Sequence, residues 1–441
     1  MMLLADWGTE PTPQALQAVL QQGLPGFAEG RLHIEALQVL KMRRSSSRRR
    51  HPHPLTVCVD LQVHEPASGR RGVQRLYGKA YREGASAGAY TRALSSAVAP
   101  AGFGGALAHL PAHDMLWWAW PNDPGLPQLP TLLDPLRLAA HLPVACGGAV
   151  GVTEVQALRY EPERRATLRC RLRDGRVIYG KTFSRAFCDG HAATVLARFE
   201  HAWAQAAQDP LAATVAQPLG QDEATHCFWQ AAAPGRPLLE LAPDDAVPAL
   251  RRLGQALARL HTTPLALGET RSVAHWLAEA RLRAQKIARV APALAARAAA
   301  LVQQLEAAAE TLPALPMSLV HGDFHPEQVW VHEGRPLLFD FDEFALGHPM
   351  EDLAAFITKL QQAKGVSNPL CTAGSHALLQ GYRATAPGHW QPQWLQWHQT
   401  VQALVQASRA FVFQVLGWPV ELALRLAVAE RCAMALQEVR T

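Results

Sequence analysis

The stretch LVHGDFHPEQVWVHEGRPLLFDFDEFALGHPMEDLAAF, which begins at Leu319, constrains the fold more than any other part of the chain. It carries five chemically demanding side chains in two groups, His321, Asp323 and His325 first, and Asp340 with Asp342 after a short hairpin. Carboxylates that lie close together at pH 7 repel each other unless a cation lies between them. A hard cation with oxygen ligands, above all Mg²⁺, suits such a pair and usually brings substrate phosphates with it.

Apolar runs around these side chains predict a strand pair. Residues 318–320 enter the loop, residues 329–331 leave it, and Glu333-Gly334 supplies a turn. Residues 336–339 then form a second strand that ends at Asp340. Pairing of these strands brings the loop and the aspartate close together in space.

The residue types indicate phosphoryl transfer. Asp340 can bind a metal ion, and the amide of Gln328 offers a further neutral oxygen ligand. Asp323 then remains free to accept the proton of an attacking hydroxyl.

The motifs HGDFHPEQ, LLFDFDE and GHPMEDLA resemble those of the aminoglycoside-phosphotransferase (choline-kinase-like) family of small-molecule kinases. The resemblance implies an α+β, bilobal, protein-kinase-like fold with a β-rich N-lobe and a helical C-lobe, and ATP and Mg²⁺ as cofactors. It implies Asp323 as the catalytic base, His321 and His325 as residues that shape its loop, and Asp352 as the residue that ties the loop down.

The same resemblance implies a metal site. Asp340 corresponds to the family's metal-binding aspartate, and Asp342 belongs to the same acidic pair. Gln328 stands where the family most often has Asn, one methylene shorter. Two other interpretations of the stretch remain: a His-x-Asp-x-His zinc cluster, disfavoured because no Cys accompanies it, and polar side chains with a purely structural role.

The front half of the chain contains an internal repeat. The run Leu76-Tyr77-Gly78-Lys79 reappears as Ile178-Tyr179-Gly180-Lys181. Strands precede each lysine, and a small-residue helix and a tryptophan-bearing strand follow it. This order is typical of a kinase N-lobe, so we expect an extra N-lobe-like domain in front of the kinase-like fold.

Only the second copy carries the residues expected around a nucleotide. Lys181 is predicted to hold phosphates and Glu200 to position it, whereas Val98 occupies the matching place in the first copy. Lys79 is therefore expected to be a solvated strand lysine.

Two further segments are predicted to contact the nucleotide. The turn YEPERR, at residues 160–165, resembles the family's Y-x-P-G-R-R turn without its Gly; Arg164 or Arg165 can reach a phosphate, and an exposed turn arginine without that role is the alternative. The segment QAAAPGRPLL resembles the hinge between lobes, where Gln230 and Ala232 would lie against the adenine.

Length and composition indicate an ordinary globular protein. The 441 residues are 49% hydrophobic and 18% charged, and no run reaches the roughly 18 apolar residues of a membrane span. The opening residues lack a basic signal-peptide start, so we expect a cytoplasmic protein without a membrane partner. Seven scattered cysteines predict reduced, mostly buried thiols. A net charge of +5 suits an anionic nucleotide and argues against nucleic acid as a partner.

We predict three segments: residues 1–147 as the N-lobe-like repeat, residues 148–233 as the kinase-like N-lobe and residues 234–441 as the helical C-lobe. The first segment is expected to be a non-catalytic cap or interaction domain, which leaves a homo-oligomer or a protein partner open. Its basic run at residues 43–54 is expected to be a solvated loop, with an acidic partner or nucleic acid as alternatives.

The predicted reaction is ATP- and Mg²⁺-dependent transfer of the γ-phosphoryl group to a hydroxyl of a sugar, an amino alcohol or a similar metabolite. Aromatic residues near the C-terminus are expected mainly in the core, with a few able to stack on such an acceptor: Trp390, Trp394, Trp397, Phe411, Phe413 and Trp418. The alternative function is a nucleotide-binding pseudokinase that acts as a scaffold or regulator.

Overall fold

The computed structural model describes residues 12–44, 55–94, 99–146, 150–185, 191–263, 270–363 and 367–440. Most of the basic run, residues 45–54, and Val98 lie outside the described residues. The chain divides into two compact units. The first contains Met1–Ala192, Leu219–Trp229 and Ala410–Trp418, and the second contains Ala193–Pro218, Gln230–Arg409 and Pro419–Thr441.

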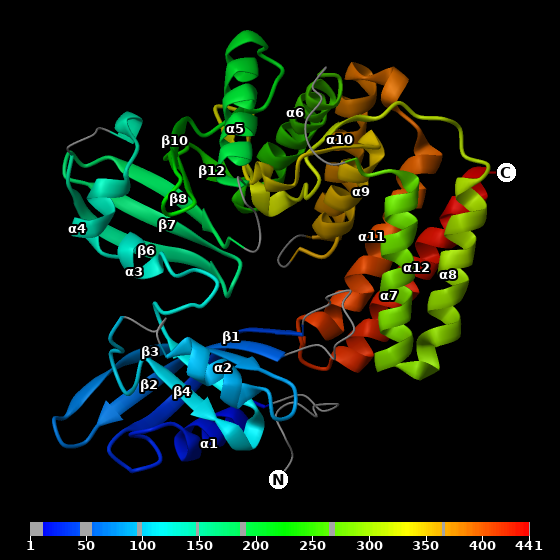
Figure 1. Ribbon diagram of the computed structural model, residues 1–441. Coiled ribbons are helices and arrows are strands. Elements are labelled where there is room, and N and C mark those ends of the chain that lie inside the picture. Colours follow the sequence, from blue (N-terminus) through cyan, green and yellow to red (C-terminus); the bar gives the residue numbers. More distant parts are fainter. Residues whose placement is uncertain are drawn as a thin grey trace. The chain divides into compact units, whose positions relative to one another are not determined.

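The strands of the first unit form two antiparallel sheets (Figure 1). The first sheet contains β1 (His33–Arg44), β2 (Leu55–Glu65), β3 (Arg70–Ala80), β4 (Leu107–Leu110) and β5 (Met115–Ala119). The second contains β6 (Val152–Glu161), β7 (Arg165–Leu172), β8 (Val177–Phe183), β10 (Pro218–Asp222) and β11 (Cys227–Ala231). Its helices are α1 (Pro13–Gly23), α2 (Ser86–Ala93), α3 (Leu129–Leu132) and α4 (Pro135–Leu138).

The two sheets have the same strand order. Among the described residues the orders are β1-β2-β3-β5-β4 and β6-β7-β8-β11-β10. In each sheet three consecutive strands lie side by side, the last strand in sequence (β5 or β11) is next to them, and the strand before it in sequence (β4 or β10) lies at the edge. The predicted lysine strands are β3 and β8, and the predicted tryptophan strands are β5 and β11. The proposed duplication therefore has a counterpart in topology, while the boundaries at 147 and 233 stay predictions.

One packing contact recurs in both sheets. A Cβ atom built on Gly78 would lie 2.6 Å from the ring of Trp117, and one built on Gly180 would lie 2.6 Å from the ring of Trp229. Each glycine immediately precedes the strand lysine. Since no Cβ fits at that distance, glycine lets the indole of the neighbouring strand lie flat against the backbone.

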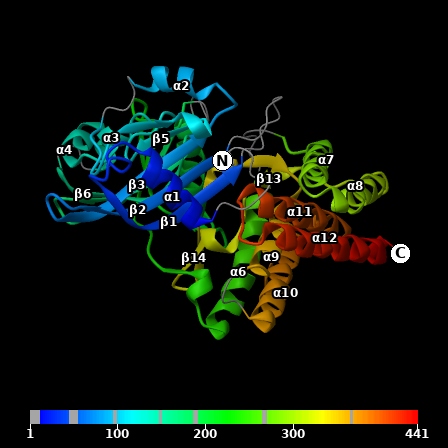
Figure 2. The same cartoon turned by 90° about the horizontal axis from the view of Figure 1, so that it is seen from below.

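Both faces of the first sheet are covered, as the two views show (Figures 1 and 2). Alternate residues of β2, among them Val57, Val59 and Leu61, pack with Leu16 and Leu20 of α1. On the opposite face, Tyr77 and Trp118 pack against α2. This period-two alternation is the ordinary way in which a strand fills two cores.

The second unit is mainly helical. Its helices are α5 (His191–Gln208), α6 (Pro243–His261), α7 (Val273–Val290), α8 (Ala295–Ala309), α9 (Pro349–Leu360), α10 (Asn368–Thr385), α11 (Pro392–Val412) and α12 (Trp418–Arg440). Its short strands are β9 (Thr214–Val215), β12 (Arg236–Pro237), β13 (Ser318–Val320), β14 (Val329–His332), β15 (Arg335–Leu338) and β16 (Ala345–Gly347). Helices α7, α8, α11 and α12 lie side by side in both views (Figures 1 and 2).

Helices α6 and α10 cross at unusually short range. A Cβ on Gly254 would lie 2.0 Å from the carbonyl oxygen of Leu378, and a Cβ on Gly381 would lie 2.0 Å from that of Arg251. The two backbones therefore touch directly, and the crossing admits no side chain at either glycine.

The aromatic residues near the C-terminus are mainly core, as predicted. Trp394, Trp397, Phe411 and Trp418 are buried, whereas Phe413 is 40% exposed. The six described cysteines are free thiols, and Cys432 is the one that is not fully buried. Across the described residues, the helices are too short or too polar to cross a membrane.

Candidate active site

The predicted loop and hairpin form as the sequence indicates. Strand β13 enters the loop, a 3₁₀ turn at Pro326–Gln328 leads into β14, and β14 pairs with β15. Glu333 and Gly334 connect these strands with φ angles of 49° and 72°, which is the left-handed pair that two-residue hairpin turns require. Phe339 N–H then donates to the carbonyl oxygen of Gln328 at 3.0 Å, which joins the end of the hairpin to the loop.

Asp352, on the first turn of α9, fastens the loop. Its two carboxylate oxygens accept the backbone N–H groups of His321 at 2.6 Å and Gly322 at 2.9 Å. Gly322 has a φ angle of 83°, and a Cβ there would lie 2.1 Å from the carbonyl oxygen of Glu343, so only glycine fits. The role that the family resemblance implied for this aspartate is confirmed.

A buried histidine and tyrosine hold Asp352 in turn. Nε2 of His261, at the end of α6, lies 3.1 Å from Asp352 Oδ2, and Nδ1 lies 2.9 Å from the hydroxyl of Tyr382 on α10. All three side chains are almost fully buried. The chain Tyr382–His261–Asp352 thus connects three helices to the loop, and buried polar groups that are fully bonded hold one geometry.

Asp323, the predicted base, is paired with Lys359. The ammonium group lies 2.7 Å from Oδ1 of Asp323. Burial acts to raise the pKa of Asp323, but the nearby charge and hydrogen bond of Lys359 outweigh it, and the pKa lies below its usual range. The carboxylate is therefore ionised at neutral pH, as a general base must be.

The two loop histidines differ in their surroundings. His321 is completely buried, and its Nε2 lies 2.9 Å from the carbonyl oxygen of Phe339. Burial, together with the charge of Lys359, lowers the pKa of His325 to about 4, and the charges of both Asp323 and Asp340 act on the same ring. His325 is therefore neutral at pH 7 and lies within electrostatic reach of the predicted base and the predicted metal ligand.

The predicted metal ligands follow the hairpin. Asp340 adopts a left-handed φ of 65° at the end of β15, and Asp342 is 5% exposed. The Oε1 atom of Gln328 is buried and accepts no hydrogen bond within the described part of the chain. An amide oxygen left in that state is suited to a cation, and these three oxygen donors match the preference of Mg²⁺.

The described residues contain no group of three or more His, Cys, Asp or Glu side chains arranged to hold a metal ion. A magnesium site in a phosphotransferase uses few protein ligands because substrate phosphates supply the rest. The donor set of two carboxylates and one amide therefore fits such a site and stays a prediction.

Helix α5 turns a different residue inward from the predicted one. Glu200 is exposed, whereas Arg198 is buried and donates to the backbone carbonyl oxygens of Phe341 and Asp342. Two residues correspond to about 200° around a helix, so these two side chains lie on opposite faces. Arg198 therefore supports the segment that follows Asp340, and the predicted role of Glu200 stays a prediction.

The residues of the first unit that are predicted to contact the nucleotide lie on or beside β7 and β8 of the second sheet. Lys181 pairs in register with Thr167, and Arg165 pairs with Phe183 at the same end. The guanidinium of Arg164 lies 3.5 Å from Glu161. The predicted hinge begins at the end of this sheet. Gln230 lies in β11, and the exposed Ala232 is the first residue after that strand.

Lys79 was expected to be a solvated strand lysine, and this expectation is wrong. Its ammonium group lies 2.7 Å and 2.6 Å from the two carboxylate oxygens of Glu163, in the turn between β6 and β7. Its side chain is 24% exposed. The two residues are far apart in sequence, so no local pattern announces the pair.

Sequence reasoning missed two residues that contact the candidate site, Lys359 and Arg198. Lys359 follows Asp352 by two helical turns, and this spacing alone would have placed both on the face of α9 that meets the loop. Arg198 gave a weaker signal: it lies three residues after Val195 and four before Ala202, on the apolar stripe of α5, but arginine is a residue type that is mostly exposed.

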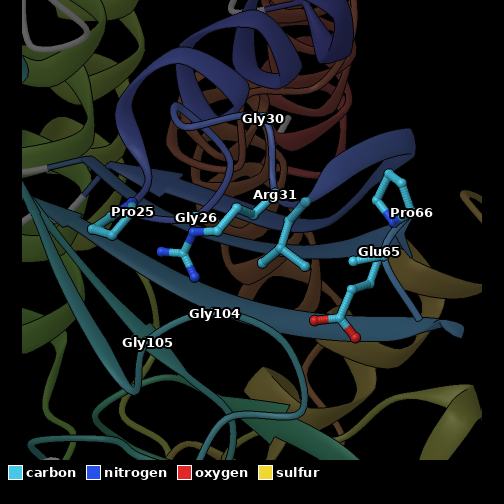
Figure 3. A pocket seen from close by; sticks show the side chains of 10 residues that line it. Pro25, Gly26, Gly30, Arg31, Glu65, Pro66, Gly104 and Gly105 are labelled. Carbon is cyan, nitrogen blue, oxygen red and sulfur yellow. The ribbon is translucent and has the colours of Figure 1, made fainter. Parts of the chain in front are cut away.

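The first unit also contains a pocket of about 630 Å³ (Figure 3). It lies between the segment after α1, the β2–β3 turn and the residues before β4, and Arg31 and Glu65 are its charged side chains. None of the predicted site residues lines it.

A sequence model of the phosphotransferase enzyme family matches residues 176–396, half of the 441 residues. No curated protein sequence matches the chain. Among solved structures, a thermostable aminoglycoside phosphotransferase APH(4)-Ia with ADP and hygromycin B is 16% identical, with a TM-score of 0.47 over 64% of this chain and 94% of that one.

Two further solved structures are similar at the same level. A choline/ethanolamine kinase family protein from Mesorhizobium loti is 14% identical, with a TM-score of 0.45 over 67% of this chain and 92% of that one. A putative fructosamine-3-kinase from Thermobifida fusca is 18% identical, with a TM-score of 0.45 over 67% and 97%.

The family match covers the lysine strand β8, the loop with Asp323, the hairpin and Asp352. The predicted α+β, kinase-like fold class is confirmed, with antiparallel sheets in the first half of the chain and helices in the second. On this evidence, the chain belongs to the phosphotransferase enzyme family.

Proposed function

We propose that this protein transfers the γ-phosphoryl group of ATP, with Mg²⁺, to a hydroxyl group of a small molecule. The observation that carries the proposal is the state of Asp323. It is ionised, it is held by Lys359 at 2.7 Å, and it lies in a loop whose backbone is bound by Asp352. A fixed, charged carboxylate is what a hydroxyl needs in order to be aligned and to lose its proton during the transfer.

As the hydroxyl oxygen of the acceptor bonds to the γ-phosphorus, the bond between that phosphorus and the bridging oxygen of ADP breaks, ADP leaves, and Asp323 accepts the hydroxyl proton. Lys359 keeps the carboxylate ionised before that step, and it lies close enough to offset negative charge that develops beside it. His325 is neutral, so its ring can donate or accept a hydrogen bond without adding a charge.

Asp340, Gln328 and Asp342 would hold Mg²⁺, which when bound neutralises phosphate charge. Arg198 fixes the backbone of the segment that presents Asp342. Lys181 would bind phosphates of the nucleotide, Arg164 would contact them from the neighbouring turn, and Gln230 and Ala232 would contact the adenine. Phosphoryl transfer depends mainly on such positioning and charge neutralisation.

The acceptor is proposed to be a hydroxylated metabolite such as a sugar or an amino alcohol. Two acidic residues of α12 that could attract a polycationic drug are already paired with arginines, Glu421 with Arg425 and Glu430 with Arg297, each at 2.7 Å. Similar structures bind hygromycin B or amicoumacin, and this pairing argues against an aminoglycoside acceptor here.

The experiment is Mg²⁺-dependent consumption of ATP by the purified protein, with a pooled library of hydroxylated metabolites. Asp323→Asn keeps the shape of the side chain and removes the base, and we expect turnover to fall by at least about a hundredfold. Asp244→Asn, an exposed change of the same kind at the start of α6, is the matched control. ATP affinity is measured separately on all three proteins.

Turnover in the wild type and in Asp244→Asn that is lost in Asp323→Asn supports the proposal. If ATP binds but all three proteins are equally inactive across the pool, the phosphotransferase proposal fails and the pseudokinase alternative stands. If turnover survives in Asp323→Asn, this residue is not the base.

A further inference from the structure

The lysine site of the first repeat is occupied by a carboxylate of the second. Lys79 and Lys181 hold equivalent places, each after a glycine that packs on a tryptophan of the next strand. In kinase-like folds this lysine binds nucleotide phosphates. Here the Lys79 ammonium binds both carboxylate oxygens of Glu163, at 2.7 Å and 2.6 Å.

The backbone at Glu163 is unusual for a side chain of its size. Its φ angle is 57°, in the left-handed region that favours glycine. The position is the one at which the resembling family turn has Gly. A residue other than glycine costs about 1 kcal/mol or more there, so contacts of the side chain must offset the strain.

Asp123 supplies a second anchor for the same turn. Its Oδ2 atom accepts the Glu163 N–H at 2.8 Å and the Tyr160 hydroxyl at 2.6 Å. Its Oδ1 atom accepts the N–H of Gly125 at 2.6 Å. A Cβ on Gly125 would lie 2.6 Å from Cα of Glu163, so the backbones of the two repeats touch here.

The first repeat also binds the start of the turn. Lys41 of β1 lies 3.1 Å from Glu161, which in turn lies 3.5 Å from Arg164 and 3.8 Å from Arg165. Burial acts to raise the pKa of Glu161, but the charges of Lys41 and Arg165 lower it to about 2. Glu161 therefore remains ionised and links the first repeat to both arginines of the turn.

The turn lies next to the nucleotide lysine of the second repeat. Arg165 pairs with Phe183, two residues beyond Lys181 on β8, and Ser184 N–H donates to the Arg164 carbonyl oxygen at 2.8 Å. A displacement of the turn thus moves Arg164, the residue proposed to contact the phosphates.

We propose that the first repeat is a positioning domain for nucleotide binding: its lysine site holds the carboxylate of Glu163 in place of a phosphate and so fixes the turn beside Lys181. Lys79 and Glu163 are positioning residues and touch no substrate. The effect on nucleotide binding rests on the proposed function. The ion pair between Lys79 and Glu163 does not depend on it.

The test compares four variants with the wild type. Lys79→Met removes the positive charge of the Lys79–Glu163 ion pair, which we call the lock, and Lys79→Arg keeps a positive charge there. Glu163→Gly removes the carboxylate and suits the left-handed backbone, so it keeps the fold. Glu35→Gln is the control, because it breaks an ion pair on the same sheet, Glu35 with Arg71 at 3.0 Å, at the opposite end of β3 from Lys79.

Two quantities are measured, ATP affinity by calorimetry and hydrogen exchange of the backbone amides of residues 160–165. For Lys79→Met and Glu163→Gly we expect exchange of these amides to accelerate and ATP affinity to fall at least about tenfold. For Lys79→Arg we expect both to stay within about threefold of the wild type, and Glu35→Gln should match the wild type.

If the turn amides of Lys79→Met and Glu163→Gly exchange at the wild-type rate, the ion pair does not fix the turn and the proposal is wrong. Faster exchange with unchanged ATP affinity overturns the positioning role. If the wild type itself binds no ATP, the proposed function and the positioning role both fail, while the exchange measurement still decides whether the lock exists.

Discussion

The ammonium group of Lys359 lies 2.7 Å from Oδ1 of Asp323, and the two side chains come from different elements, helix α9 and the loop after β13. Because the charge and hydrogen bond of this lysine are the largest of the effects that lower the pKa of Asp323, ahead of the charge of Arg409, Lys359→Met should raise that pKa. The acid limb of the kcat/KM profile then moves to higher pH, while the high-pH plateau falls by less than about tenfold because the base remains.

Lys359→Arg is the control for this prediction, since it keeps a positive charge beside the carboxylate. Its acid limb should coincide with that of the wild type. A Lys359→Met enzyme whose acid limb does not move would show that Lys359 has no influence on the base.

Glu351 should make stability depend on pH. Burial, with the charge of Asp352, raises the pKa of Glu351 from 4.5 to about 8, against the opposing effects of Arg271 and Trp276. The buried side chain is therefore protonated, its contribution to folding is complete below pH 4.5, and that contribution is lost as the pH rises toward 8.

Glu351→Gln keeps the neutral shape at every pH. The free energy of unfolding of this variant should decline less between pH 5 and pH 8 than that of the wild type, by a difference of the order of a few kcal/mol. Urea unfolding at a series of pH values measures the slope. Glu343→Gln, an exposed change beside the same Arg271, is the control, and identical slopes in wild type and Glu351→Gln would contradict the prediction.

Gln328 should set the need for Mg²⁺. Its Oε1 atom is buried and bonded to no described residue, so Gln328→Leu removes an oxygen donor without opening a hydrogen bond there. We expect the Mg²⁺ concentration for half-maximal activity to rise about tenfold or more. A titration of activity with Mg²⁺ at saturating ATP measures it, and an unchanged midpoint would exclude Gln328 from the metal site.

The contact between α6 and α10 should tolerate no side chain. Gly254→Ala places a methyl group 2.0 Å from the Leu378 carbonyl oxygen, and we expect a loss of stability of about 3 kcal/mol. Gly88→Ala in α2 is the opposite case: the new methyl group meets only the end of Arg92, at 3.5 Å, and helix propensity should add about 0.5–1 kcal/mol. Thermal and urea unfolding compare the two.

Local patterns in the sequence were enough to place the loop and the hairpin. Each strand there is a short apolar run, and Glu333-Gly334 forms a two-residue turn in which both residues have a positive φ angle. The predicted repeat has a parallel in packing, because Gly78 and Gly180 each lie against a tryptophan ring that leaves no room for a Cβ. Such features depend on a few neighbouring residues, so the sequence contains them directly.

Ion pairs between residues that are far apart in the sequence could not be predicted from such local patterns. Nothing near Lys79 indicates Glu163, and the turn that contains Glu163 could be understood only as a family turn that had lost its glycine. Helix α5 shows the same limit in another form. Spacing from Lys181 pointed to Glu200, which is exposed and whose role stays a prediction, whereas Arg198 is the buried residue of this helix that contacts the segment after Asp340.

The buried contacts of Tyr382, His261 and Asp352 also have a consequence for the order of events during folding. The loop with Asp323 takes its shape from Asp352, and Asp352 is held by groups on α6 and α10. The base is therefore in place only after three helices, one of them well downstream of the loop, have assembled. A chain that ends before α10, or one still being synthesised, has every residue of the loop but lacks the contacts that fix Asp323, so the proposed phosphoryl transfer would begin only once the chain is folded.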